Sequence, residues 1–371
     1  MKFTCDSTLL QNILQNSLDF CSQKSISNSS FVLLTLNNSL LNIRTTDGKM
    51  GFDSSINVKG EENGSIALPC DKFLNIIKTF NSENIVLENK DESFLYIKSE
   101  NKASNFKIKY NDSSIFPKRE EVEGKKDIEI ESTKFINMIN QSIISVNETY
   151  AEDNKAVFNG VLMDIEKNKI NMVSTDGKSM SYIQIEKKCE PSAEGKKIVI
   201  PARFLKEVSK IFKIEEFLNI YIRENAIFIK NSNTLIYSSL YKGQFPNYKR
   251  VLDANTEYCL VYKVEDMLQA LRKVILMADN SNKRIIFKIK KGLTTISSVD
   301  NDLGSASDEL ENNFEGEEVK FALNYSYLLN QVKALTSDYL KMEFTNSDCQ
   351  IRIRPTNEEN YVHIIMPMSL N

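Results

Sequence analysis

One apolar pattern recurs six times along the 371 residues, and this repeat limits the possible folds most strongly. Each copy is a short strand-like run, a polar or capping residue, and a helix with apolar residues at i, i+3 and i+4. Helices with one apolar face must pack on an apolar surface. The copies begin at Lys2, Ser65, Asp127, Lys197, Tyr258 and Lys320.

The segments after each helix are rich in β-prone residues and supply such a surface. They include FVLLTL, NIVLEN, GVLMDIE and RIIFKI, and they are separated by Asn, Asp, Gly and Ser. One helix followed by three or four strands, six times over, predicts an α+β fold dominated by antiparallel sheet.

Two longer repeats group the six copies into pairs. The tetrapeptide TDGK at 46–49 recurs at 175–178, a spacing of 129 (175 − 46), and a Phe-Pro step recurs at the same spacing (245 − 116 = 129). We therefore predict three similar domains, with boundaries in the segments KREEVEGKKD and VLDANTEY. The predicted domains are 1–125, 126–253 and 254–371.

The charge balance excludes an overall basic surface. The chain has 47 basic and 50 acidic residues and a formal net charge of −3. A nucleic acid would therefore have to meet a local surface of the protein.

The cysteines and the N-terminus predict a soluble, intracellular chain. No C-x-x-C and no stretch of the roughly 20 apolar residues that span a bilayer is present, and MKFTCDSTLL is not a signal peptide. We expect no metal and no cofactor, and we expect buried thiols in a reducing compartment. The six cysteines are Cys5, Cys21, Cys70, Cys189, Cys259 and Cys349.

Residues that could serve an enzyme have simpler explanations. Asp47 and Asp176 stand in Asp-Gly dipeptides, which form hairpin turns. His363, in the run YVHIIM, is expected in a half-buried strand rather than as a general base. Two alternatives stay open: a metal-dependent phosphoryl-transfer enzyme that uses Asp176 and Lys178, and a repeat scaffold that binds proteins and never DNA.

Four motifs occur in order along the chain: MKFT at the start, STDGK, QFPNYKRVL and IIMPMSL near the end. Together with the three domains, they resemble the bacterial DNA polymerase III beta subunit family, the sliding clamps. The resemblance implies a non-catalytic, cytoplasmic protein. Two chains would form a head-to-tail ring around duplex DNA and tether replicative and translesion polymerases, the clamp loader and repair proteins.

The ring size agrees with this implication. Twelve helices of about 10 Å diameter that stand side by side in a ring leave a central bore of about 28 Å, whereas a ring of six leaves only about 9 Å. Duplex DNA, whose major groove alone is about 12 Å wide, therefore needs two chains.

The resemblance also implies a cleft for client peptides between the second and third domains. Methionines re-pack around different ligands, Gly177 allows close approach of a backbone, and Arg250 can hold a peptide carboxylate or carbonyl. Without the resemblance, these apolar residues would be read as core. The matching residues are Phe158, Thr175, Gly177, Lys178, Met180, Pro246, Arg250, Val251, Ile364, Met366, Pro367 and Met368.

Two departures from the family pattern remove cations from the rim of this cleft. Lys178-Ser179 stands where the family commonly has His-Arg, and Ser369 replaces an Arg, with Asn371 extending the terminus. We expect a peptide preference that differs from the family average.

Basic residues in or beside the repeated helices are expected to face DNA. The resemblance adds Lys24, which lies in the loop after the first helix at the position of a basic residue with which the family contacts DNA. Loose phosphate contacts without base reading would permit sliding. Each residue can also be an ordinary solvated charge. The set is Lys24, Lys72, Lys78, Lys134, Arg203, Lys206, Lys210, Lys213, Arg272, Lys273 and Lys333.

The resemblance places the contact between two chains on an edge strand. Phe106 and Ile108 of the first domain would meet Ile275 and Leu276 of the third. A long edge strand needs a partner, but these residues can equally be buried within their own domains.

Overall fold

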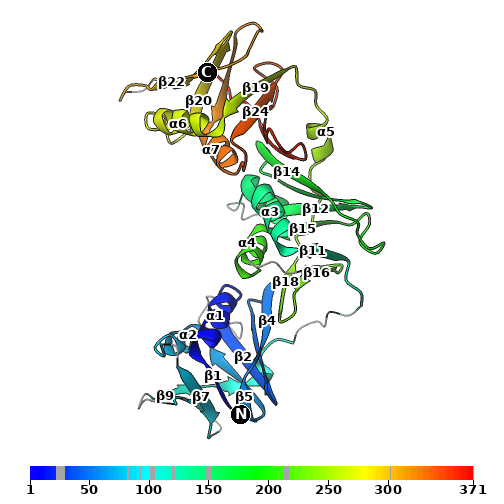
Figure 1. Ribbon diagram of the computed structural model, residues 1–371, viewed down its shortest axis with the longest axis vertical. Coiled ribbons are helices and arrows are strands. Elements are labelled where there is room, and N and C mark those ends of the chain that lie inside the picture. Colours follow the sequence, from blue (N-terminus) through cyan, green and yellow to red (C-terminus); the bar gives the residue numbers. More distant parts are fainter. Residues whose placement is uncertain are drawn as a thin grey trace. The chain divides into compact units, whose positions relative to one another are not determined.

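A computed structural model describes residues 1–21, 30–81, 83–91, 93–100, 105–118, 122, 124–147, 153–212, 217–300 and 302–370. These residues form two compact units. The first unit is made of Met1–Lys134 and Phe204–Leu240, and the second of Phe135–Arg203 and Tyr241–Asn371. Figure 1 shows the helices and strands along the chain.

All six predicted helices are confirmed, and each directly follows a strand. In α6 the residues Met267, Ala270, Leu271 and Val274 are fully buried at the predicted spacing. Asp6 caps α1, because its carboxylate accepts a hydrogen bond from the amide of Leu9 at 2.9 Å. The six helices are α1 (Ser7–Leu18), α2 (Cys70–Ile77), α3 (Ser132–Ser142), α4 (Ala202–Ile211), α6 (Val264–Ile275) and α7 (Tyr325–Lys333).

Shorter helices lie between these elements. The five-residue helix α5 (Tyr248–Leu252) follows the second Phe-Pro step and was not predicted. Within the units, α1 packs beside α2, and α6 packs beside α7 (Figure 1). The 3-10 helices are η2 (Ser113–Ile115), η3 (Ile143–Ser145) and η4 (Asp153–Asn159).

The first unit contains two antiparallel sheets. The five-stranded sheet has the order β5 (Lys59–Glu62), β1 (Lys2–Asp6), β7 (Asn84–Asn89), β8 (Phe94–Ser99) and β9 (Asn105–Lys109). The nine-stranded sheet has the order β10 (Asn111–Asp112), β6 (Gly64–Pro69), β2 (Phe31–Asn37), β3 (Leu40–Thr46), β4 (Met50–Asn57), β18 (Thr234–Ser239), β17 (Ala226–Lys230), β16 (Phe217–Ile222) and β11 (Ile128–Glu131).

The second unit also contains two antiparallel sheets. The eight-stranded sheet has the order β15 (Lys197–Pro201), β12 (Gly160–Glu166), β13 (Lys169–Thr175), β14 (Ser179–Glu186), β26 (Tyr361–Ile365), β25 (Ile351–Pro355), β24 (Tyr339–Phe344) and β19 (Tyr258–Lys263). The four-stranded sheet has the order β22 (Ser307–Glu311), β21 (Leu293–Ser298), β20 (Arg284–Lys290) and β23 (Val319–Asn324).

The predicted repeat is visible as two kinds of three-strand meander. A-meanders are β2-β3-β4, β12-β13-β14 and β20-β21-β22, and B-meanders are β7-β8-β9, β16-β17-β18 and β24-β25-β26. The third strand of an A-meander pairs with the third strand of a B-meander at β4–β18 and at β14–β26. The sheets therefore continue from one predicted domain to the next.

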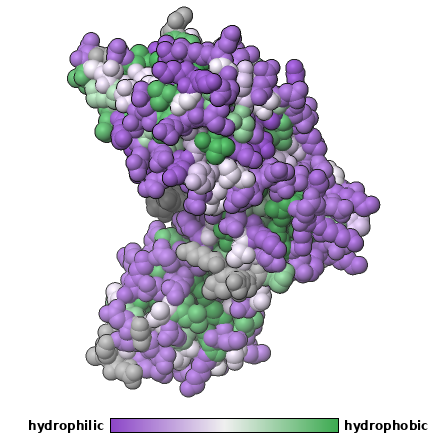
Figure 2. All heavy atoms as spheres, turned by 45° about the horizontal axis from the view of Figure 1, so that its top comes forward, coloured by the Kyte–Doolittle hydropathy of each residue, from purple (hydrophilic) through white to green (hydrophobic). Residues whose placement is uncertain are grey.

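Alternation along the strands builds the cores. In the first unit, Phe3 of β1, Leu34 of β2 and Phe73 of α2 are fully buried in one apolar cluster. Polar residues dominate the face drawn in Figure 2, and hydrophobic residues appear there in small groups. No helix among the described residues is long and apolar enough to cross a membrane.

The cysteine prediction was partly wrong. Cys5, Cys21 and Cys70 are buried as expected, and burial raises the pKa of the Cys5 thiol to about 12. However, Cys259 and Cys349 are exposed. Cys259 lies on β19, the edge strand of the eight-stranded sheet, so its side chain does not have sheet neighbours on both sides.

Candidate functional site

The second TDGK turn is built by its own hydrogen bonds. Thr175 Oγ1 donates to the carbonyl of Ser179 (2.6 Å) and accepts from the amide of Gly177 (3.0 Å). Asp176 Oδ1 accepts from the amides of Lys178 (2.9 Å) and Ser179 (2.7 Å). The first copy makes the equivalent bonds, and its glycine has the same φ of +89°. The repeated tetrapeptide is therefore a repeated turn, as predicted.

An apolar cluster begins directly after this turn and gathers side chains from η4, β12, β13, β14, β15, β26 and the linker before β19. It contains four of the predicted cleft residues: Met180, Ile364, Phe158 and Val251. Met180 and Ile364 lie directly opposite each other in the β14–β26 pair. The other members are Val157, Leu162, Val173, Tyr182, Val199, Tyr241, Phe245, Tyr248, Leu252 and Val362.

The chain after β26 stays beside the turn. The amide of Met366 donates to the carbonyl of Lys178 at 2.8 Å, and the amide of Met368 donates to the carbonyl of Ala322 at 2.8 Å. Met366 keeps 44% of its surface exposed, while Pro367 and Met368 are half-buried. An accessible apolar side chain therefore lies next to the TDGK turn.

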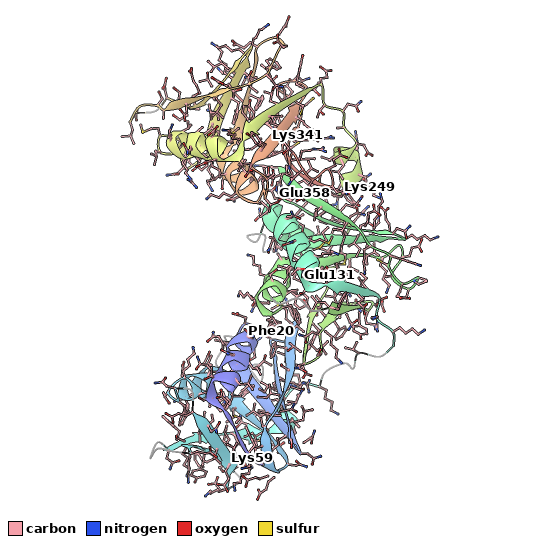
Figure 3. All side chains as sticks on the ribbon, viewed as in Figure 1. Phe20, Lys59, Glu131, Lys249, Lys341 and Glu358 are labelled. Carbon is pink, nitrogen blue, oxygen red and sulfur yellow. The ribbon has the colours of Figure 1, made fainter. Side chains whose placement is uncertain are left out.

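The linker helix α5 is attached to β12 and β14 by polar groups as well as by packing. The Tyr248 hydroxyl donates to Asp164 Oδ2 at 2.8 Å, and its ring stacks on Tyr182 with 6.0 Å between centroids. Lys249, labelled in Figure 3, pairs with Glu166 at 2.8 Å and lowers the pKa of that carboxyl. Burial raises the pKa of Tyr182 to about 12, so its hydroxyl stays protonated.

Arg352 of β25 holds the end of this linker. Its Nη2 donates to the carbonyls of Leu252 (2.6 Å), Val251 (3.3 Å) and Ala254. Burial lowers the pKa of the guanidinium. The three carbonyls give its buried Nη2 group hydrogen-bond acceptors. The predicted residues Pro246 and Arg250 are exposed beside it.

Sequence reasoning missed Arg352 and several apolar members of the cluster. The period-2 alternation of strands could have found Tyr182 and Val362, because they are two residues from Met180 and Ile364 and share their face. No local pattern marks Arg352, because its partners lie about a hundred residues earlier in the chain.

The predicted DNA-facing residues that the structure describes are all exposed. Ion pairs involve Lys134 with Glu131 (3.1 Å), Lys210 with Glu207 (2.9 Å) and Asp19 (3.2 Å), and Lys273 with Asp308 (2.9 Å). The carboxylates in these pairs reduce the positive potential at the surface around the three lysines. Lys24 and Lys213 lie outside the described residues.

The predicted contact residues lie on an edge strand and at the end of a helix. Phe106 and Ile108 belong to β9, the edge strand of the five-stranded sheet, and both side chains pack on the first core. Leu276 directly follows α6 and is 83% exposed, whereas Ile275 is half-buried.

The structure favours a turn over a catalytic role for Asp176, whose carboxylate also accepts from Ser179 Oγ at 3.0 Å. No group of three or more His, Cys, Asp or Glu that could hold a metal occurs among the described residues. His363 is fully buried, more than the half-buried strand position predicted.

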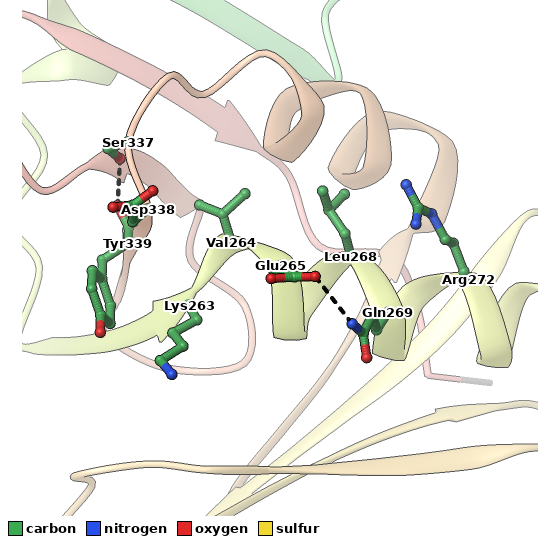
Figure 4. A pocket seen from close by; sticks show the side chains of 9 residues that line it. All are labelled: Lys263, Val264, Glu265, Leu268, Gln269, Arg272, Ser337, Asp338 and Tyr339. Carbon is green, nitrogen blue, oxygen red and sulfur yellow. Dashed lines mark hydrogen bonds between the residues drawn. The ribbon is translucent and has the colours of Figure 1, made fainter.

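A hollow of about 550 Å³ lies between the start of α6 and β24 (Figure 4), and Arg272 is the predicted site residue that lines it.

Three family models match successive parts of the chain. Residues 1–119 match the N-terminal domain, 129–247 the central domain and 249–369 the C-terminal domain of the DNA polymerase III beta subunit.

Similar proteins and structures agree with these matches. The chain is 31% identical to a protein named beta sliding clamp from Treponema pallidum, with 99% of each chain covered, and 25% identical to one from Staphylococcus epidermidis, with 91% and 88% covered. Its fold is similar to the crystal structures of the DNA polymerase III subunit beta from Pseudomonas aeruginosa (TM-score 0.94, 20% identity) and of the sliding clamp from Bacillus subtilis (TM-score 0.93, 22% identity), with full coverage of both chains. The chain therefore belongs to the DNA polymerase III beta subunit family, the beta sliding clamps, which are non-catalytic processivity factors of the replicative polymerase.

Proposed function

We propose that two copies of this chain close head to tail into a ring around duplex DNA and carry client proteins on the apolar cluster beside the second TDGK turn. The observation that supports the ring is the order of the meanders. Within the chain, two A-meanders pair with the B-meanders of the following domain, at β4–β18 and β14–β26. The last A-meander ends at the edge strand β22, and the first B-meander ends at the edge strand β9.

Pairing of β22 with β9 of a second chain would repeat the same junction. It would also remove two exposed strand edges, which are otherwise open to non-specific association. β9 carries Lys107 and Lys109, and β22 carries Asp308, Glu309 and Glu311, so the two edges have opposite charge.

The two junctions within the chain predict the register of this third junction. Counting along the paired strands from β6, β15 and β23 places Phe52, Ser181 and Ala306 at equivalent positions. Counting from β1, β11 and β19 places Phe106, Ile236 and His363 at equivalent positions. Because Phe52 faces Ile236 and Ser181 faces His363, we expect Ala306 to face Phe106 and Ser307 to face Asn105 of the partner.

Exposed apolar side chains near β22 favour a covered surface. Leu276 is 83% exposed and Leu303 is 87% exposed, and covering them would remove apolar surface from water. We propose that the partner chain covers Leu276, with Ile275, Phe106 and Ile108 as neighbours.

The remaining expectations from the resemblance are part of the same proposal. We propose boundaries near 125 and 253 for the three domains, a cytoplasmic location, and a bore lined by the exposed basic residues of the repeated helices. Ion pairs of Lys134, Lys210 and Lys273 would keep phosphate contacts loose, which permits sliding.

The clients we propose are polymerases, the clamp loader and repair proteins that carry a short peptide with hydrophobic anchors. Met366 is exposed beside the buried Met180 and Ile364, and methionine side chains can re-pack to admit such anchors. Lys178 and Arg250 are exposed at its border and can hold acidic or carbonyl groups of the peptide.

An engineered disulfide tests the ring. In a background with Cys259 and Cys349 replaced by serine, Asn105→Cys combined with Ser307→Cys should give a cross-linked dimer under mild oxidation. Directly opposed residues of antiparallel strands have the Cα spacing that a disulfide needs. The control pair Asn105→Cys with Ala306→Cys is shifted by one residue, which puts the two thiols on opposite faces. A monomer that never cross-links, or equal yields from both pairs, would contradict the proposed junction.

The topology of DNA binding is tested with the cross-linked ring. After loading on a nicked circle by its clamp loader and oxidation, the protein should remain bound in high salt and leave when the circle is cut. Retention on cut, linear DNA would show electrostatic rather than topological binding.

A further inference from the structure

A buried hydrogen-bond chain crosses the β14–β26 junction. The Tyr361 hydroxyl lies 2.6 Å from His363 Nε2, His363 Nδ1 lies 2.8 Å from Ser181 Oγ, and Ser181 Oγ lies 2.8 Å from Ser145 Oγ. All four side chains are buried. A neutral imidazole donates at one nitrogen and accepts at the other, so both ring nitrogens are satisfied in either tautomer. Burial lowers the pKa of His363 to about 3, which keeps the ring neutral.

This chain lies on the opposite face of β26 from the apolar cluster. His363 and Ser181 are directly opposed and point toward Ser145 of η3, a face we call the inner face. Because side chains alternate along a strand, Val362 and Ile364 point the other way, into the cluster. One strand therefore carries polar groups inside and the proposed peptide site outside.

The equivalent pair at the junction in the first unit is apolar, although Ser54 and Thr234, hydrogen-bonded at 2.9 Å, lie on the same face. There the inner pair is Phe52 and Ile236, both buried and apolar. The outer face carries Asp53, whose Oδ2 lies 3.6 Å from Arg44 Nε. At this junction a slip of one residue would move the largely buried Asp53 carboxylate away from Arg44 onto the inner face and Phe52 onto the outer face, so ordinary alternation specifies the register.

Alternation alone is weaker at the second junction, because an outer face that receives peptides must be apolar. If the inner face were apolar as well, a slip of one residue would exchange one apolar set of side chains for another at little cost in free energy. The His363–Ser181 pair changes this, because a slip would place the imidazole among apolar side chains without its partners. Leaving such a buried polar group unpaired costs the free energy of its desolvation without the hydrogen bonds that offset it. Buried polar residues are known to specify register in this way.

We propose that His363, through its hydrogen bonds to Ser181 and Tyr361, is a positioning residue that fixes the register of β26 and so holds Ile364 and Met366 in place at the peptide site. This inference rests on the proposed function of that site. Gln331 of α7 supports the same strand, since its Nε2 donates to the carbonyl of Ile364 at 3.3 Å.

The test compares His363→Leu, which removes the chain but keeps a buried side chain, with His363→Gln, which keeps a donor and an acceptor. The probe is a fluorescein-labelled synthetic peptide with leucine and phenylalanine anchors, measured by anisotropy with full-length protein. We expect the Kd to rise at least tenfold for His363→Leu and less than threefold for His363→Gln. Hydrogen exchange of amides 361–366 should be at least tenfold faster in His363→Leu. Ser181→Ala provides a second variant with a smaller side-chain change, for which we expect a three- to tenfold weaker Kd.

Ile236→Ala is the matched control, because it damages the equivalent position of the first junction. Its Kd for the peptide should stay within twofold of wild type even if its thermal stability falls. The inference is overturned if His363→Leu and Ser181→Ala bind the peptide as wild type does and show wild-type exchange at 361–366. If wild type itself does not bind the peptide, the proposed site is wrong, and the exchange rates still decide whether His363 fixes the register.

Discussion

The stability of this protein should depend on pH through His363, the one histidine in the chain. Burial lowers its pKa to about 3 in the folded state, against about 6.5 in an unfolded chain. Between these values the unfolded chain binds one proton more than the folded one. Stability is therefore full above pH 6.5 and is lost as the pH falls below it, by about 1.4 kcal/mol per pH unit.

The expected loss between pH 7.5 and pH 5.0 is about 2 kcal/mol from this residue. Other groups titrate in the same range, so the measured quantity is the difference between wild type and His363→Gln. Urea unfolding at both pH values and at one protein concentration gives the two free energies of unfolding. We expect the advantage of wild type over His363→Gln to shrink by about 2 kcal/mol at pH 5.0. The reasoning would be refuted by equal pH dependence of the two proteins, or by ring signals of His363 that titrate near pH 6.5 in NMR spectra.

Three further changes probe other parts of the structure. Arg352→Gln removes the donor of three linker carbonyls, so the free energy of unfolding should fall by about 1.5 to 3 kcal/mol. Calorimetry that shows no change in Tm would contradict this role. Met366→Ala changes an exposed side chain, so stability should stay within about 0.5 kcal/mol, while the affinity for the leucine and phenylalanine peptide falls; unchanged anisotropy titrations would move the site elsewhere. Leu276→Asp should leave the melting of each chain intact but convert the dimer to monomer; a dimer that persists in sedimentation at micromolar concentration would exclude Leu276 from the interface.

The sequence alone was sufficient for the repeated architecture. Helix stripes such as Met267, Ala270 and Leu271 and the period of the strands are local properties, so the six helices and the antiparallel sheets could be predicted from neighbours in the chain. The TDGK turns were predicted for the same reason, because an Asp-Gly pair forms its hydrogen bonds within four residues. The resemblance then placed Met180, Ile364, Phe158 and Val251 in what proved to be one cluster.

The tertiary structure decided which side chains distant in sequence meet. Arg352 reaches linker carbonyls about a hundred residues away, and His363 reaches Ser181 across 182 positions. The helix η3 brings Ser145 to the same buried chain. No local pattern encodes such pairs, because a buried polar residue is stable only where the fold supplies its partner. For that reason the one histidine could be assigned to a strand from the sequence, but its role at the β14–β26 junction could be recognised only in the folded protein.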